Sequence, residues 1–489
     1  MAKRVAIIDI GSNSVRMVIY ERTSRFAFHL LYETKTKVRI SQDIYKNNGN
    51  LQNIPMQRAF NALNDFATII KSFKARKTLC VATSALRDAP NKKVFINRVK
   101  NELKLNIKVI SGESESYFGA IACANLLPEQ ENALSIDIGG GSTEFSIINK
   151  KNVSNNISLE LGTVRLKELF YDTNNIDGAI EYIDKKLEVL NDIEVSSLIG
   201  IGGTFRAISI AIMKSSDYPF KKLHSFECKP KDFNKFLLKI LKTDENDLKS
   251  LFIKKNRFDI IKPGALILSR VMKKILISNV ITSGVGVREG VYLHDLLRHS
   301  KDKLPINYNT SVRYILDSFV EDSAFSNQLN KLTKNIFELT HKHFKIDEKY
   351  SKELGIAAKL YISGSNINFY FQNIHSYQIL KSALEFGFTH REIILIATLN
   401  KYATKQSPSS RHMNKYKSLL PDKYTLNTLN YILSLSIALL SHKPTNIDFS
   451  IKFEDGDFMV KSKDYLYLSK EAVNKLTKVK DFNIKIFAP

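Results

Sequence analysis

The sequence predicts two α/β domains that face each other across a cleft, followed by a mainly helical region. A β-branched run that ends in Asp-Ile-Gly and continues into a second strand-like run occurs at residues 5–21 and again at residues 134–148. Two equivalent turns, one early in each of two regions, indicate a duplicated domain. From about residue 301, glycine becomes sparse and long helical periodicities dominate. This change of texture predicts a different architecture for the last third of the chain.

The two Asp-Ile-Gly segments have the composition of phosphate-binding turns. In the second copy, Asp137 is followed by Ile, three consecutive glycines, two small polar residues and Glu144. Residues without side chains let a backbone approach a ligand closely and turn sharply, and successive exposed N–H groups form a concavity that suits an anion. Carboxylates beside such a concavity commonly serve a hard cation such as Mg²⁺. The alternative is a simple hairpin turn with two solvated acids.

The chain of 489 residues is long enough for about two to four domains, and its charge is strongly positive. The formal net charge is +24 at pH 7, and the excess of Lys and Arg is spread over both halves of the chain. Such a charge attracts polyanions, including nucleic acid, polyphosphate and acidic lipid headgroups. A lysine-rich genome is the alternative explanation, so the charge permits a polyanionic substrate without requiring one.

Neither a signal peptide nor a membrane span is predicted. The first residues lead directly into a strand-like run without an apolar h-region, and no uninterrupted apolar run reaches the ~18 residues that a span needs. The cysteines Cys80, Cys123 and Cys228 are far apart and form no CxxC pair, so we expect reduced thiols. We therefore expect a cytoplasmic protein with no membrane partner.

Strands and helices alternate in the first part of the chain. The expected strands are 4–9, 15–21, 26–34, 38–40, 77–82 and 107–110, and the expected helices are 55–73 and 92–103. Arg87 follows the strand at 77–82, where α/β sheets place ligands, and it could bind a phosphate in a bidentate manner; a surface arginine is the alternative. Glu113 and Glu115 fall in the first turn of the next helix. The helix dipole favours acids there, and a carboxylate could also act there as a general base.

Further glycine turns link strands to helices beyond residue 150. They are Gly162 with Thr163, Gly200 to Gly203 with Thr204 as the expected N-cap, and Ser283 to Gly286 before a helix that begins near Arg288. A helix N-terminus behind a glycine turn suits an anion or a nucleotide, and a tight turn without a ligand is the alternative. Beyond a charged linker at 300–310, the expected helices are 311–321, 327–341, 352–362, 375–385, 390–402 and 426–440, and the expected strands are 447–453, 457–461 and 479–487.

With these segments in place, the chain resembles the Ppx/GppA phosphatase family of bacterial exopolyphosphatases and pppGpp 5′-phosphohydrolases. The resemblance runs through residues 4–300 and more loosely to the C-terminus. The segments that carry it, in order, are DIGSNSVRMVIYE, VATSALRDAPN, VISGESESYFGA, SIDIGGGSTEFSI, LELGTVRLKELF, GIGGTF, RFDIIKPGA and SGVGVREGV. The Asp-Ile-Gly hairpins also resemble those of the superfamily that holds actin, sugar kinases and heat-shock chaperone ATPases.

This resemblance implies a fold and a reaction. It implies two actin-like (ribonuclease H-like) domains at residues 1–130 and 131–300, with the active site in the cleft between them, and a helical HD-like domain at residues 310–489. It also implies Mg²⁺-dependent hydrolysis of a terminal phosphoanhydride, either of inorganic polyphosphate or of pppGpp, which gives ppGpp. The family resemblance favours a homodimer, and no specific nucleic-acid partner is expected.

The resemblance further implies which residues carry the reaction. The second Glu of the family's ISG-x-E-E motif maps to Glu115, which would be the base for the attacking water. Ser114 replaces the first Glu of that motif, and Glu113 is the alternative base. Arg87 would neutralise charge in the transition state, a role that needs a preorganised donor.

Metal and phosphate ligands are implied in the same way. Asp137 and Glu144 would be the acids on the metal side, and Asp9 would assist through water. The residues whose backbone N–H groups would hold the terminal phosphates are Gly11, Ser12, Asn13, Ser14, Gly139, Gly140, Gly141, Ser142 and Thr143.

The C-terminal region resembles the HD-type module of longer family members, in which a His-Asp pair binds metal. Where the family reads roughly LHDIG, this chain has Leu360-Tyr361-Ile362-Ser363-Gly364, and His375-Ser376 is what is left of the downstream motif. We therefore expect a degenerate module that binds no metal. It would help to bind long polyphosphate or form a dimer interface.

Two other functions stay open at this point. One is a (p)ppGpp-binding regulator of the stringent response with weak catalysis, which Ser114 and the degenerate HD motif favour. The other is a kinase or ATPase of the same superfamily, for which only the turn at 200–204 suggests an adenosine pocket. Free phosphate as product, without a phosphorylated acceptor, would favour the phosphohydrolase.

Overall fold

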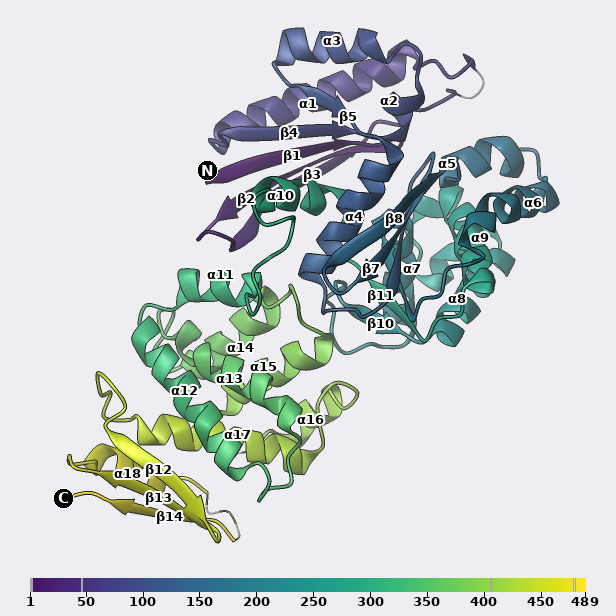
Figure 1. Ribbon diagram of the computed structural model, residues 1–489. Coiled ribbons are helices and arrows are strands. Elements are labelled where there is room, and N and C mark those ends of the chain that lie inside the picture. The colour runs from purple at the N-terminus through teal and green to yellow at the C-terminus, as the bar shows by residue number, and fades with distance from the viewer. Residues whose placement is uncertain (1–2, 45–46, 405–406, 478, 480) are drawn as a thin grey trace. The chain divides into compact units, whose positions relative to one another are not determined.

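A computed structural model describes residues 3–44, 47–404, 407–477, 479 and 481–489, and the chain divides into two compact units (Figure 1). The N-terminal unit spans Met1–Tyr308 and the C-terminal unit spans Asn309–Pro489. Strands and helices are mixed in the N-terminal unit, which confirms the predicted α/β class. The predicted division of this unit into two actin-like domains, with a boundary at residue 130, stays a prediction.

The first sheet of the N-terminal unit has the strand order β3-β2-β1-β4-β5. Its strands are β1 (Arg4–Ile10), β2 (Ser14–Arg22), β3 (Phe28–Lys37), β4 (Lys77–Ala82) and β5 (Ile107–Val109). The first three strands pair antiparallel, whereas β4 is parallel to β1 and β5 is parallel to β4. Helices α1 (Asn53–Ser72) and α3 (Lys92–Leu103) pack on it, and the short α2 (Ser84–Asp88) follows β4. One apolar face of α1 is buried, through Ala59, Leu63, Phe66 and Ile70.

The second sheet repeats this arrangement, with the strand order β10-β11-β9-β6-β7-β8. Its strands are β6 (Ala133–Ile138), β7 (Thr143–Asn149), β8 (Asn152–Leu159), β9 (Ser197–Ile201), β10 (Phe226–Cys228) and β11 (Asn279–Thr282). Here β6, β7 and β8 pair antiparallel, and β9 and β11 continue in parallel. Apart from the added β10, the order and directions match the first sheet, which confirms the predicted duplication. The helices that accompany it are α5 (Thr163–Leu166), α6 (Ile176–Lys186), α7 (Gly202–Ser215), α8 (Pro230–Lys242) and α9 (Phe258–Lys274).

Two helices, α4 (Gly112–Leu126) and α10 (Val287–Leu297), lie between the sheets (Figure 1). Helix α4 packs on β7 and β8, and α10 packs on α4 and on β1. Because α10 follows a strand of the second sheet but rests on the first, it ties the two together. Its Glu289 carboxylate accepts a hydrogen bond from the Tyr20 hydroxyl of β2 at 2.5 Å, and its Arg288 pairs with Glu33 of β3 at 2.7 Å.

Two sequence-based expectations in the N-terminal unit are wrong. Residues 38–40 are not a strand; Arg39 has a left-handed backbone, with φ 48°, and its N–H donates to the Asn13 carbonyl at 3.0 Å. This segment therefore supports the first Asp-Ile-Gly turn. Thr204 is not the N-cap of α7, which begins at Gly202. Gly202 has φ +80°, a conformation that glycine tolerates, and the helix begins three residues earlier than a Thr204 N-cap would place it.

The C-terminal unit is helical and ends in a small sheet. Its helices are α11 (Thr310–Phe319), α12 (Ser323–Thr340), α13 (Ser351–Lys359), α14 (Gln372–Ala383), α15 (His390–Tyr402), α16 (Ser410–Lys415), α17 (Lys423–Leu439) and α18 (Tyr467–Asn474). Its strands are β12 (Phe449–Glu454), β13 (Asp457–Ser462) and β14 (Asn483–Phe487). The predicted helices are confirmed, whereas α16 and α18 were not predicted. The expected strand at 479–487 begins only at Asn483, and its residue 480 lies outside the described residues.

The resemblance of the C-terminal unit to an HD-type domain stays a prediction.

In the part of the chain that the structure describes, no helix has both the length and the apolar character needed to cross a bilayer.

Candidate active site

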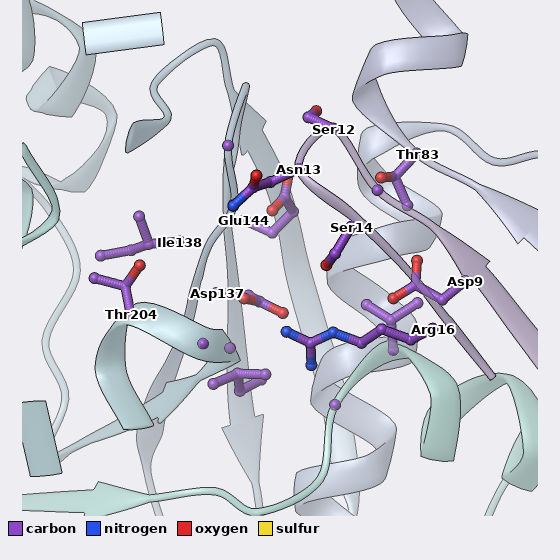
Figure 2. Close-up of a pocket in the computed structure, with 18 of the residues that line it drawn as sticks. Asp9, Ser12, Asn13, Ser14, Arg16, Thr83, Asp137, Ile138, Glu144 and Thr204 are labelled. Carbon is purple, nitrogen blue, oxygen red and sulfur yellow. The ribbon is translucent and has the colours of Figure 1, made fainter. Parts of the chain in front are cut away.

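Both Asp-Ile-Gly turns line a single cleft of the N-terminal unit, shown in Figure 2. The cleft also receives residues from the first turns of α4, α7 and α10. The predicted site residues that line it are Asp9, Gly11, Ser12, Asn13, Ser14, Glu115, Asp137, Gly139, Gly140, Ser142 and Glu144. The Thr143 side chain is fully buried and its hydroxyl donates to the Leu161 carbonyl, outside the cleft. Arg87 reaches the site through its contact with Glu115.

The two turns are structural copies of each other. In each one, the glycine that follows Asp-Ile donates its N–H to a carbonyl three residues later, from Gly11 at 3.1 Å and from Gly139 at 2.9 Å. In the strand register, Asp9 lies opposite Arg16 in the first hairpin, and Asp137 lies opposite Glu144 in the second. The duplicated hairpins therefore place two equivalent aspartates in the cleft, but a cation across from one and an anion across from the other.

The second turn presents N–H groups that suit an anion. The Thr163 N–H donates to the Gly139 carbonyl at 3.0 Å, and two further N–H groups of α5 donate to the Gly140 carbonyl at 2.8 and 3.1 Å. Within the described chain, no acceptor pairs with the N–H groups of Gly140 and Gly141. Carbonyls that are already bound and N–H groups that are free make this turn a donor site.

The carboxylates of the cleft influence one another; Glu144 is buried, and Asp9 and Asp137 are half-buried. Burial raises the pKa of Asp137 to about 6 and the pKa of Glu144 to about 7. Burial also raises the pKa of Asp9, and the Arg16 charge offsets part of this rise. Figure 2 shows the Arg16 guanidinium between the carboxylates of Asp9 and Asp137. The nearby arginine charges therefore offset part of the cost of ionising Asp9 and Asp137 in the cleft.

Glu115 occupies the first turn of α4 and is held by Arg87. The Arg87 Nη1 donates to Glu115 Oε2 at 3.0 Å, and the Glu115 side chain is only 13% exposed. The Ser111 hydroxyl caps the helix by accepting the Ser114 N–H at 3.1 Å, which fixes the turn that carries Glu115. Burial, and then the charge of Glu144, raise the pKa of Glu115 well above its usual range, and Arg87 offsets part of that rise. A carboxylate with a raised pKa is suited to proton transfer.

The two neighbours of Glu115 that the sequence also singled out do not line the cleft. Glu113 is exposed, and the Ser114 side chain is bound to the Ser111 hydroxyl at 3.0 Å. Of Glu113, Ser114 and Glu115, it is therefore Glu115 that lines the cleft together with the carboxylates of the two hairpins.

Four arginines that sequence reasoning did not assign to the site also line the cleft: Arg16, Arg206, Arg257 and Arg288. Burial and the charges of neighbouring arginines lower the pKa of Arg16 and of Arg257, although guanidinium groups stay charged in proteins. The four positive charges in one buried cleft favour a ligand with several negative charges. Arg16 could have been noticed in the sequence, because it stands between buried apolar neighbours of a strand.

Glu289 is an acid beside this arginine cluster, and the charges of Arg288 and Arg206 act on it. It accepts the Gly286 N–H at 2.7 Å and the Tyr20 hydroxyl at 2.5 Å. Burial by itself would raise the pKa of Glu289, but the Arg288 charge and the Tyr20 hydroxyl outweigh it and leave the pKa below its usual value. An ionised Glu289 therefore fixes the start of α10, where it reaches the first sheet.

Comparison with known proteins identifies the family of this chain. The sequence model of the Ppx/GppA phosphatase family matches residues 18–299, more than half of the chain. The chain belongs to the Ppx/GppA phosphatase family. A second model, described as Ppx/GppA phosphatase domain III, matches residues 309–476 of this family member.

Individual relatives agree with this assignment. The chain is 32% identical over 286 residues to the bifunctional 3-dehydroquinate synthase/phosphatase of Fusobacterium nucleatum, and the match covers 55% of the chain but only 43% of that relative. It is 24% identical over 495 residues to a guanosine-5′-triphosphate,3′-diphosphate pyrophosphatase of Aliivibrio fischeri, with 98% and 94% covered. The structure of an exopolyphosphatase from Cytophaga hutchinsonii matches with 25% identity and a TM-score of 0.57, covering 62% of this chain and 100% of that one.

Gly162 supports the second turn of this Ppx/GppA phosphatase. A Cβ at this position would overlap the backbone of Gly140 and Gly141, so Gly162→Ala must displace the turn. We expect at least about a tenfold loss of kcat/KM together with a lower Tm, as for overpacking in general. Gly11→Ala, whose Cβ would meet nothing nearer than 3.4 Å, is the matched control for stability. Equal Tm values for the two variants would contradict this account.

The buried Glu144 should make the metal-free protein less stable as the pH rises. Its pKa in the folded state is about 7, above the ordinary value of 4.5, so the folded state binds the proton more tightly than the unfolded chain. Stability is then lost as the pH rises from about 4.5 to about 7. Glu144→Gln should raise the Tm at pH 8 by roughly 2–4 °C for each kcal/mol gained and leave it nearly unchanged at pH 4. Glu113→Gln, at an exposed position, is the control; an unchanged Tm of Glu144→Gln at pH 8 would contradict the prediction.

Proposed function

We propose that this Ppx/GppA phosphatase hydrolyses the terminal phosphoanhydride of a linear phosphate chain, either of inorganic polyphosphate or of pppGpp. The observation that carries the proposal is the Glu115 carboxylate, bound to Arg87 and facing the carboxylates of two anion-binding hairpins in one cleft. The names of two relatives, a guanosine pentaphosphate pyrophosphatase and an exopolyphosphatase, support the two substrates. Both substrates present the same terminal group to the same turns.

Different groups of the cleft would bind the phosphates, take the proton and stabilise the transition state. The free N–H groups of the second hairpin would hold the terminal phosphate, and the Glu115 carboxylate would take a proton from the attacking water. The Arg87 guanidinium lies next to Glu115 and would stabilise the charge of the transition state. The arginine cluster would bind the phosphates that follow in the chain.

Mg²⁺ is the cation that we propose for this site. Among the described residues no group of three or more His, Cys, Asp and Glu side chains could hold a metal by itself. Mg²⁺ is usually bound by one or two carboxylates together with water and substrate phosphates, and the carboxylate oxygens of Asp137 and Glu144, which line the cleft, fit that mode. When bound, the ion would neutralise phosphate oxygens; Asp9 would assist through water.

The test is phosphate release by the purified protein from long-chain polyphosphate, pppGpp and ATP in parallel, with Mg²⁺ and with excess EDTA. We expect turnover of at least one of the first two substrates with Mg²⁺ and none with EDTA. A phosphorylated acceptor or preference for ATP would replace the proposal with a kinase or ATPase. Binding of pppGpp without turnover would replace it with a (p)ppGpp-binding regulator.

A further inference from the structure

The C-terminal unit carries a group of exposed apolar side chains at residues 367–374, here called the aromatic loop. Ile367, Phe369, Tyr370, Phe371 and Ile374 are 56%, 75%, 87%, 55% and 45% exposed. Single exposed apolar residues are common on protein surfaces, but a contiguous group of this kind usually marks an interaction site. The aromatic loop runs into the first turn of α14.

The surface beside the aromatic loop is cationic. The ammonium groups of Lys381 and Lys401 each lie 4.9 Å from the ring centre of Tyr377, and that of Lys415 lies 5.2 Å from the ring of Tyr416. The hydroxyls of the two tyrosines are 3.2 Å apart, so the three lysines surround one aromatic cluster.

Acidic side chains do not neutralise this surface. Residues 354–384 and 393–421 contain no Asp or Glu, and within the described chain no carboxylate forms an ion pair with Lys381, Lys401 or Lys415. Burial, and then the charges of these three lysines, lower the pKa of the nearby His412 to about 4. The charges of the three lysines therefore act on the imidazole of His412 as well as on the surface of the unit.

The aromatic loop and the lysines belong to one face. Ile374 and Lys381 are seven residues apart on α14, which places them two turns apart on the same side of the helix. Lys401 of α15 contacts the same tyrosine ring as Lys381, and the Asn373 side chain donates to the carbonyls of Asn400 and Ala403 at 2.9 Å each. Ile374 of the aromatic loop and the ammonium groups of Lys381 and Lys401 therefore lie on neighbouring parts of α14 and α15.

The charge of this face decides between possible occupants. A second copy of the chain would bring the same lysines together across a two-fold axis, and like charges in an interface are unfavourable. An anionic partner avoids that repulsion. Single-stranded nucleic acid would use the aromatic rings for base stacking, but Ile367 and Ile374 offer no ring. Exposed aromatic and aliphatic side chains beside lysines are typical of surfaces that lie in the interface of an anionic membrane.

We propose that this face of the C-terminal unit docks on the surface of an anionic lipid bilayer. The aromatic loop enters the headgroup region, while Lys381, Lys401 and Lys415 contact the anionic headgroups. The expectation of no membrane partner rested on the lack of a spanning segment, and docking on the surface needs none. The proposal is independent of the reaction in the cleft.

The test is co-sedimentation of the full chain with vesicles of phosphatidylcholine alone and of phosphatidylcholine with about one third phosphatidylglycerol. We expect bound protein on the anionic vesicles, with little on the neutral ones. The variant with Phe369→Ser, Tyr370→Ser and Phe371→Ser should bind at least about fivefold less, and Lys381→Gln with Lys401→Gln should lower binding by a similar factor and reduce its salt dependence. The matched control replaces Tyr465, Tyr467 and Leu468 by serine, because these side chains are 78%, 71% and 57% exposed elsewhere in the same unit.

Four results would overturn the proposal. Equal binding to neutral and anionic vesicles would do so. Equal loss in the control variant would also do so, because it would show that any exposed apolar group of this unit contributes as much as the aromatic loop. A wild-type dimer that the serine variant converts to a monomer would instead make the face an interface between copies. Binding of single-stranded RNA, lost in the same variants without vesicle binding, would make it a nucleic-acid surface. A circular-dichroism melt of each variant verifies that it is folded.

Discussion

Glu115→Gln is expected to lower kcat for phosphate release by about 10²–10⁴-fold, the range for loss of a general base. Glutamine has nearly the same shape and can still accept a hydrogen bond from Arg87, which in the wild type is 3.0 Å from Glu115 Oε2. It cannot take a proton from water. The substrate should therefore still bind, and the loss should appear in kcat with little change in KM. Initial rates and a binding isotherm for the same substrate measure the two effects separately.

Glu113→Gln provides the matched control for this experiment. It removes one carboxylate from the same helical turn, but at an exposed position outside the cleft. We expect less than about a twofold change in kcat, as for surface substitutions in general. A large loss with Glu113→Gln and a small loss with Glu115→Gln would exchange the two assignments and make Glu113 the base.

Arg87→Met is expected to lower kcat by about 10²–10³-fold, because one preorganised donor to a developing charge contributes an effect of that size. It should also change the pH dependence. The Arg87 charge holds the pKa of Glu115 below the value that burial and Glu144 would otherwise give. Without that charge the pKa rises, so the base is protonated over a wider range. The acidic limb of the kcat profile should move to higher pH.

Arg87→Lys separates the two contributions of this residue. Lysine restores a positive charge near Glu115 but not the planar fork of donors. We expect the acidic limb to return toward its wild-type position while kcat stays at least tenfold low. An Arg87→Met profile with an unshifted acidic limb would show that Arg87 does not act on the base.

Several elements and part of the site could be predicted from the sequence. The strand at Lys77–Ala82 and the helix at Lys92–Leu103 have the predicted bounds, since apolar periodicity and turn residues agree there. The two Asp-Ile-Gly turns lie in one cleft because their sheets are duplicates, which repetition of the motif indicates. Glu115 joins them because its helix begins directly after a strand of the first sheet.

The arginine cluster could not be predicted in the same way. Arg16 and Arg288 come from segments more than 270 residues apart, and only the packing of α10 on the first sheet brings them together. Thr204 is a good N-cap residue and predicts a start for α7 that is three residues too late, because the helix begins at Gly202, which has a left-handed backbone. Backbone conformations of this kind depend on contacts that a local pattern does not contain.

The strand register places a different residue opposite the aspartate of each hairpin. Each hairpin alone is one half of a pseudo-symmetric pair, and a linear phosphate chain is nearly the same when read from either end. Asp9 faces Arg16 in one half, and Asp137 faces Glu144 in the other. This single difference breaks the pseudo-symmetry of the pair, so the two hairpins present different groups to the cleft. A ligand that is alike at both ends would therefore meet two unlike turns.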